Sequence, residues 1–129
     1  MRFKSKPMLT ILLIDDDETE YFLIKRMMQD CYDKPYLLRY SDTLEKAITV
    51  LQNEKIDVIL LDDKLGKGRT AQTTVPELKN VAQAIPMIVI SSAIDAAYLK
   101  DKTILNVYDI VDKYHLRQKI EAGILSETN

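Results

Sequence analysis

The chain of 129 residues lacks several features that would indicate particular classes of protein. Its single cysteine, Cys31, cannot form a disulfide within the chain, so we expect a reducing compartment, the cytoplasm. The net charge of -2 gives no overall electrostatic reason to expect binding to nucleic acid or to a membrane. The apolar stretch after the basic N-terminus stops at Asp15, far short of the ~20 residues that cross a bilayer. We therefore expect neither a signal peptide nor a membrane anchor.

The length and the 47% hydrophobic composition are those of one domain with one core. We expect an N-terminal tail at residues 1–8, a domain at residues 9–126 and a C-terminal tail at residues 127–129. This length leaves no room for an output domain, which predicts that the chain acts through another protein.

Apolar runs without polar alternation predict strands that are buried on both faces. Ile11–Ile14, Asp57–Leu61 and Met87–Ile90 are almost entirely aliphatic. Two β-prone segments, Tyr36–Tyr40 and Val107–Val111, complete a set of five strands.

Helical spacing of apolar residues predicts a helix after each strand. A capping-box pattern at residues 74–77 sets the start of the third helix, and Asn106 suits a left-handed exit from the fourth. Five strand–helix repeats with right-handed crossovers predict an α/β fold, a doubly wound five-stranded parallel sheet. The expected helices are Thr19–Cys31, a second one capped by Ser41 or Asp42 that includes Leu44 to Leu51, Thr74 to about Ala84, about Asp95 to Thr103, and His115 to about Ser126.

Acidic residues directly follow two of the predicted strands. Asp15-Asp16-Asp17 comes after the first strand, and Asp62-Asp63 comes after the third. The carboxyl ends of parallel strands lie at one edge of an open α/β sheet, and ligands bind at that edge. Carboxylates crowded there repel one another unless a cation or a lysine neutralises them. The sequence therefore predicts a site for a hard metal ion.

Together with Ser91 and Lys113 at two further strand ends, these residues resemble the receiver domain of bacterial two-component response regulators. The resemblance covers nearly the whole chain and implies the flavodoxin-like (βα)5 receiver fold. The matching pieces, each at the carboxyl end of a strand, are Ile11–Asp16, Asp57–Asp62, Pro86–Ser91 and Ile110–Lys113.

The resemblance implies that Asp62 accepts a phosphoryl group from a histidine kinase or phosphotransfer protein, forming an acyl phosphate. Such a domain is a signalling module with a downstream protein target; it is not an enzyme, but it assists its own phosphoryl transfer and hydrolysis. Phosphoryl transfer depends on positioning and on neutralising charge, so the site needs a divalent cation. Mg²⁺ is the expected cofactor, with Asp16 and Asp62 as direct ligands. Asp15 is expected to act partly through water, and the backbone carbonyl of Lys64 is expected to complete the set.

By the same resemblance, Lys113 contacts the phosphoryl oxygens and Ser91 donates its hydroxyl to one of them. Phosphorylation would draw both side chains inward and rearrange the loops that follow. Among the departures from the family pattern, two bear most on switching. Tyr114 replaces a proline, which predicts a trans peptide bond or visible strain at Lys113–Tyr114. Ile110 replaces the aromatic switch residue, for which Tyr108 and Tyr114 are candidate substitutes.

Two other interpretations stay open. The chain could be a pseudo-receiver, an interaction module that keeps the fold without switching. It could also be a phosphatase of the haloacid-dehalogenase type that uses Asp15 and Asp17 as nucleophile and acid/base. Asp17, however, is expected to begin the first helix, and Asp63 to point away from Asp62.

The expected partner surface lies on the fourth helix, fifth strand and fifth helix, the usual partner or dimer surface of the family. Its mixed charges suit reversible, salt-sensitive contacts, and we expect a monomer or a weak phosphorylation-linked dimer. The exposed residues expected there are Lys100, Asp101, Lys102, Asp109, Arg117 and Glu121.

Overall fold

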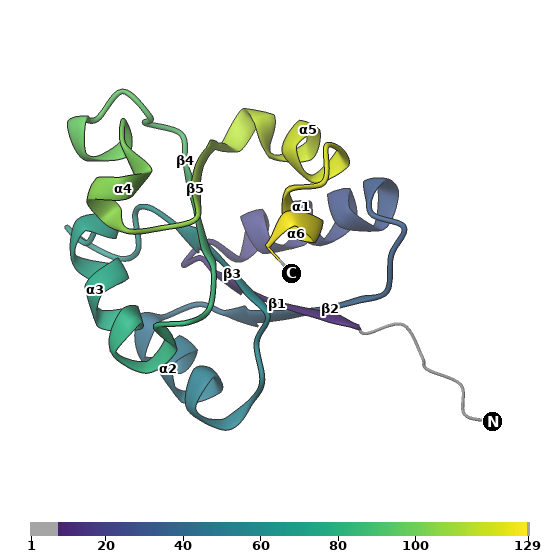
Figure 1. Ribbon diagram of the computed structural model, residues 1–129, viewed down its shortest axis with the longest axis horizontal. Helices are drawn as coiled ribbons and strands as arrows, with labels where there is room; N and C mark the ends of the chain where they lie inside the picture. The colour runs from purple at the N-terminus through teal and green to yellow at the C-terminus, as the bar shows by residue number, and fades with distance from the viewer. Residues whose placement is uncertain (1–7, 129) are drawn as a thin grey trace.

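The computed structural model describes residues 8–128 and contains one sheet of five parallel strands. The strand order is β2-β1-β3-β4-β5, so the predicted doubly wound parallel sheet is confirmed (Figure 1). Of the predicted tails, residues 1–7 and 129 lie outside the described part of the chain, and the domain bounds 9–126 stay a prediction. The strands are β1 (Leu9–Ile14), β2 (Tyr36–Ser41), β3 (Val58–Asp62), β4 (Met87–Ser91) and β5 (Asp109–Asp112).

Helices cover both faces of the sheet (Figure 1). Helices α1 (Glu18–Cys31), α5 (Leu116–Glu121) and α6 (Ile124–Glu127) lie over one face. The other face carries α2 (Leu44–Asn53), α3 (Ala71–Ala82) and α4 (Lys102–Leu105). Within residues 8–128, none of the helices combines the length and apolar character needed to cross a membrane. Two 3₁₀ turns complete the fold, η1 (Ala97–Leu99) and η2 (Lys113–His115).

The apolar side chains of the central strands divide between two cores, one on each face. Leu61 and Val89 belong to the core under α2, α3 and α4, whereas Leu60 and Ile90 belong to the core under α1 and α5. Successive side chains of a strand point to opposite faces. The side chains of successive residues at a strand end, such as Asp62 and Asp63, therefore point toward different faces. This alternation positions the candidate site.

The starts of two helices differ from the prediction. Helix α2 is capped by Thr43, whose hydroxyl accepts from the Lys46 N–H, and not by Ser41 or Asp42. Helix α3 begins at Ala71 instead of Thr74, because the distant carboxylate of Asp63 accepts from the Ala71 N–H at 3.0 Å. The capping-box interpretation of residues 74–77 was wrong.

The predicted fourth and fifth helices are interrupted. In place of one helix over residues 95–103 there is η1, followed by the single turn of α4, because the Asp101 side chain caps α4 at the Thr103 N–H. The C-terminal helix divides at Gly123, whose φ of 99° is left-handed and ends α5 before α6 begins. Asn106 adopts the predicted left-handed conformation, with φ 59°.

Strand β5 begins two residues later than the predicted Val107, and its register with β4 places Ser91 opposite Asp112. The Lys113–Tyr114 peptide bond is trans, as one of the two predicted outcomes required; the described residues contain no cis bond. Of the residues expected to be exposed on the partner surface, Asp109 is half-buried, whereas Lys100, Asp101, Lys102, Arg117 and Glu121 are exposed.

Candidate functional site

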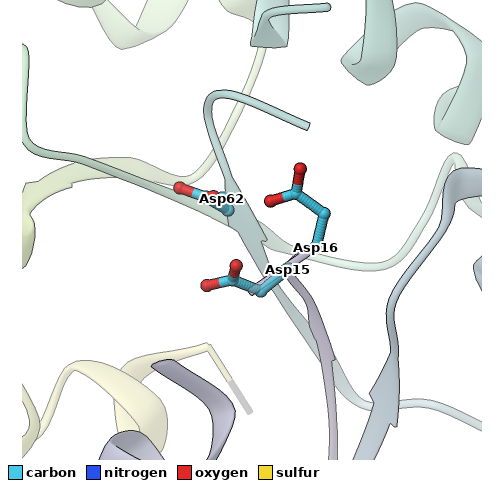
Figure 2. Close-up of side chains that lie close together, drawn as sticks. All are labelled: Asp15, Asp16 and Asp62. Atoms are coloured by element: carbon cyan, nitrogen blue, oxygen red, sulfur yellow. The ribbon is translucent and has the colours of Figure 1, made fainter. Parts of the chain in front are cut away.

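Three carboxylates meet at the carboxyl edge of the sheet. Asp15 and Asp16 follow β1 and Asp62 ends β3, two strands that pair directly with Ile14 opposite Leu61. One oxygen from each carboxylate lies within 4.8 Å of the others (Figure 2). Asp15 and Asp62 are buried, whereas Asp16 is exposed at the opening of the site. The structure therefore brings together the three side chains that the sequence predicts as metal ligands.

Backbone groups orient two of these carboxylates. Asp15 Oδ1 accepts from the Asp17 N–H, and Asp16 Oδ2 accepts from the Gly66 N–H in the loop after β3, both at 2.9 Å. The Tyr40 hydroxyl donates to the backbone carbonyl of Asp15 at 2.8 Å. These bonds tie the site to β2 and to the loop after β3, which limits the directions in which the acids can move.

Burial disfavours the ionised forms of two of these carboxylates. Burial raises the pKa of Asp15 to about 8, and a hydrogen bond with Glu20 adds to the shift. Burial also raises the pKa of Asp62 to about 6, although the positive charge of Lys113 opposes it. Oxygen ligands at these spacings suit a hard divalent cation such as Mg²⁺, whose charge would favour the ionised forms. The donor set therefore fits the predicted metal.

Lys113 reaches the site as predicted, but it binds a second acid as well. Its Nζ lies 3.2 Å from Asp62 Oδ1 and donates to both oxygens of Glu20, at 2.7 and 2.6 Å. Burial alone would lower the pKa of Lys113, but the hydrogen bonds with Glu20 and the charge of Asp62 raise it. Burial likewise opposes ionisation of Glu20, yet its hydrogen bonds with Asp15 and Lys113 lower its pKa. The lysine is therefore charged and shared between two carboxylates.

Glu20 was missed by the sequence prediction. Asp17 caps α1 through the Thr19 N–H, so Glu20 stands third inside the helix, where an acid ordinarily returns to bind the cap. That local role hides the contact with Lys113, which lies 93 residues further along the chain. Asp17 itself serves as the predicted start of the helix, so its carboxylate is engaged there and not in the acidic cluster.

Ser91 is directed to the other face of the sheet. Its hydroxyl donates to Asp63 Oδ2 at 3.2 Å and accepts from the Ala93 N–H at 3.0 Å. Asp63 also accepts from the Tyr98 hydroxyl at 2.7 Å and from the Ala71 N–H at 3.0 Å. Asp63 and Ser91 are buried, with 0% and 2% of their surface exposed. Asp63 points away from Asp62 as predicted, and it holds the serine that was predicted to serve Asp62.

The tyrosine that shares Asp63 with this serine is Tyr98 of η1, which was not among the two candidates proposed from the sequence. Burial and the hydrogen bond to Asp63 raise the pKa of Tyr98 to about 12. Tyr114 is 83% exposed, and Tyr108 packs against the core under α1 and α5. Ile110 packs, partly buried, against the opposite core. The residues around Tyr98 in the sequence do not indicate that it contacts Asp63.

The Lys64 side chain is exposed in the loop after β3, and the metal-binding role of its carbonyl stays a prediction. A cavity of about 380 Å³ adjoins the site between α1 and the start of α5. Glu20 and Lys113 stand at its polar side, and the rest of its lining is largely apolar; its other residues are Leu23, Ile24, Met27, Ile90, Ser92, Tyr114, Leu116 and Arg117.

The acidic cluster, the lysine and the doubly wound sheet together define a class of signalling domain. The model of the response regulator receiver domain matches residues 11–124, and the chain belongs to this family. Among curated proteins it is similar to the transcriptional regulatory protein DcuR of Escherichia coli K12, with 33% identity over 125 residues. The match covers 91% of this chain and 49% of that protein, so the chain spans about half the length of the curated relatives it matches.

Solved structures share the fold at low sequence identity. The receiver domain of a sensor histidine kinase from Pseudomonas aeruginosa PAO1, described with a magnesium ion in its active site cleft, has a TM-score of 0.75 at 17% identity. That match covers 94% of this chain and 97% of the other. A response regulator protein from Burkholderia pseudomallei, described with a phosphorylated aspartic acid, a calcium ion and citrate, has a TM-score of 0.72 at 19% identity. It covers 92% of this chain and 69% of the other.

Proposed function

We propose that Asp62 accepts a phosphoryl group from a histidine kinase or phosphotransfer protein in a Mg²⁺-dependent reaction, and that the changed surface signals to a downstream protein. One observation carries the proposal: the carboxylates of Asp15, Asp16 and Asp62 converge within 4.8 Å, with Lys113 Nζ 3.2 Å from Asp62. This is the arrangement of negative ligands and fixed positive charge that phosphoryl transfer requires.

In the proposed reaction, a carboxylate oxygen of Asp62 attacks the phosphorus atom while the phosphorus–nitrogen bond of the donor histidine breaks. Bound Mg²⁺ would supply neutralising charge for the phosphoryl oxygens, held by Asp16 and Asp62 directly, by Asp15 partly through water, and by the carbonyl of Lys64. Lys113 would place its ammonium group against the same oxygens. Since Glu20 shares this ammonium, Lys113 would have to shift its hydrogen bonds from Glu20 to the phosphoryl group.

The descriptions of two structural neighbours support this function, one with magnesium in its cleft and one with a phosphorylated aspartic acid. For the target we propose another protein, bound on the surface that carries Lys100, Lys102 and Arg117, and we propose that the chain works in the cytoplasm. We further propose that it is a monomer or dimerises weakly when phosphorylated, with no part in binding nucleic acid or membranes.

The test uses acetyl phosphate as phosphodonor and beryllofluoride as a phosphoryl analogue, each with Mg²⁺. We expect the wild-type chain to gain the mass of one phosphoryl group and to change its NMR spectrum with beryllofluoride. Asp62→Asn should lose both responses, and a chelator should abolish them in the wild type. Asp17→Asn is the matched control, because that aspartate caps α1, and it should respond as the wild type does.

Two results would replace the proposal. If neither reagent changes the wild-type chain, the protein is an interaction module without phosphorylation switching. If it instead turns over a phosphate ester, with activity lost in Asp15→Asn and retained in Asp62→Asn, it is a small phosphatase. The capping role of Asp17 argues against the second outcome, since that side chain is already engaged as the start of a helix.

A further inference from the structure

The neighbour of the proposed phosphoacceptor collects three hydrogen bonds from three different parts of the chain. Asp63 Oδ1 accepts from the first residue of α3, and Asp63 Oδ2 accepts from the hydroxyls of Ser91 and Tyr98. The donors lie 8, 28 and 35 residues away in sequence. The carboxylate therefore links β4, η1 and α3 at a point one residue from Asp62.

The Ser91 hydroxyl has one proton to donate, so Asp63 and a phosphoryl group on Asp62 would compete for it. In this structure that proton goes to Asp63. A phosphoryl group on Asp62 offers strong acceptor oxygens, so Ser91 can serve it only by giving up the bond to Asp63. Asp63 then keeps the donors from Ala71 and Tyr98 alone.

We propose that Asp63 is a positioning residue that holds the hydroxyl of Ser91 away from the phosphoryl site, and that Ser91, Asp63 and Tyr98 form a relay from Asp62 to the η1–α4 segment. This inference rests on the proposed function. It supplies a route for switching in a chain whose fifth strand carries Ile110 in place of an aromatic residue.

The relay reaches η1 by two connections. The Tyr98 hydroxyl is bound to the carboxylate that Ser91 releases, so its hydrogen bond to Asp63 changes when Ser91 leaves. The Ala93 N–H donates to Ser91 Oγ, so movement of the hydroxyl also pulls on the loop that precedes η1. Asp101, Lys102 and the exposed Ile104 follow directly in the chain, so the change arrives at the proposed partner surface.

Two conservative substitutions should act in opposite directions on the affinity for beryllofluoride with Mg²⁺. In Asp63→Asn, the amide nitrogen can donate to the oxygens of Ser91 and Tyr98, which frees the serine proton, so the affinity should rise. In Tyr98→Phe, Asp63 loses a donor and holds Ser91 more firmly, so the affinity should fall. We expect changes of about threefold to tenfold, as one exchanged hydrogen bond produces. A merely structural role would weaken binding in both variants.

Two further variants and a measurement of hydrogen exchange away from the site complete the experiment. Ser91→Ala should bind more weakly and should abolish the effects of both substitutions when combined with them. Tyr114→Phe, at an exposed tyrosine, should bind as the wild type does. In the wild type, beryllofluoride should also alter amide hydrogen exchange across residues 97–105, and this change should be lost in Tyr98→Phe.

The possible failures are distinguishable. If wild-type and Asp62→Asn chains respond identically to beryllofluoride, the proposed function falls and the relay falls with it. If the wild type binds through Asp62 but Asp63→Asn and Tyr98→Phe leave both the affinity and the exchange at residues 97–105 unchanged, only the relay is overturned. A loss of affinity in both variants also overturns it.

Discussion

Two neighbouring aspartates, Asp62 and Asp63, leave the same strand and meet opposite environments. Asp63 is fully buried and accepts hydrogen bonds from a backbone N–H and two hydroxyls. Asp62 lies beside other acids, and its pKa rises to about 6 because burial outweighs the nearby charge of Lys113. The difference shows that hydrogen bonds within the fold satisfy Asp63. Among the described residues, Asp62 lacks such a set of donors, so its carboxylate can bind an external cation or react with a phosphoryl group.

The largest effect that separates the two acids is on stability. Asp63→Ala leaves two buried donors and the half-buried Tyr98 hydroxyl without their acceptor, so we expect the free energy of unfolding to fall by about 3 kcal/mol or more. Asp62→Ala removes a carboxylate that burial disfavours, so in metal-free buffer it should not lower stability. Urea unfolding followed by circular dichroism measures both. Equal losses in the two variants would contradict the comparison.

The next effect concerns pH. Asp15, whose pKa is about 8 in the fold against an ordinary 3.8, and Asp62, at about 6, both favour the protonated form when folded. Such groups contribute stability that is complete below their ordinary pKa and is lost as the pH rises through the folded value. In metal-free protein, the wild type should lose about 2 kcal/mol relative to Asp15→Asn between pH 4 and pH 8.

Unfolding measured at the two pH values in a chelator, for wild type and variant, checks this expectation. Added Mg²⁺ should restore the wild type at pH 8 and should help Asp15→Asn much less. A constant difference between the two proteins across this range would show that Asp15 is ionised throughout.

A smaller effect tests how Lys113 is shared. Glu20→Gln removes a negative charge that raises the pKa of Asp62 and releases the lysine toward Asp62. Both consequences lower that pKa, by about one unit. NMR titration of the aspartate carboxyl carbons measures it. Glu18→Gln, at an exposed position on the same helix, is the matched control and should change it far less. An unchanged pKa in Glu20→Gln would mean that Glu20 does not compete for the lysine.

The smallest effect concerns Asp17, the third aspartate of the run, which lies outside the comparison of Asp62 with Asp63. Asp17→Ala removes the side-chain cap of α1, so stability should fall by about 1 kcal/mol. Beryllofluoride binding should be retained, because this carboxylate serves the helix. Loss of binding in a folded Asp17→Ala protein would instead assign Asp17 to the site.

Local pattern was a good guide to some parts of the molecule and a poor one to others. The aliphatic runs of β1, β3 and β4 predicted their strands to within two residues, because strands buried on both faces must be apolar throughout. The start of α3 and the division of the C-terminal helix were mispredicted. The carboxylate of Asp63, just after β3, caps the former, and Gly123 adopts a left-handed conformation in the latter.

The sequence by itself determined which strands are buried and that Asp15, Asp16 and Asp62 reach the same edge of the sheet. Both follow from short-range apolar patterns and the order of the elements. Only the tertiary structure decided that Lys113 is shared with Glu20 and that Ser91 and Tyr98 both donate to Asp63. These partners lie 28 to 93 residues apart, and packing on the two faces of the sheet selects them. A side chain that can bind several neighbours does not reveal from its own position in the sequence which one it meets.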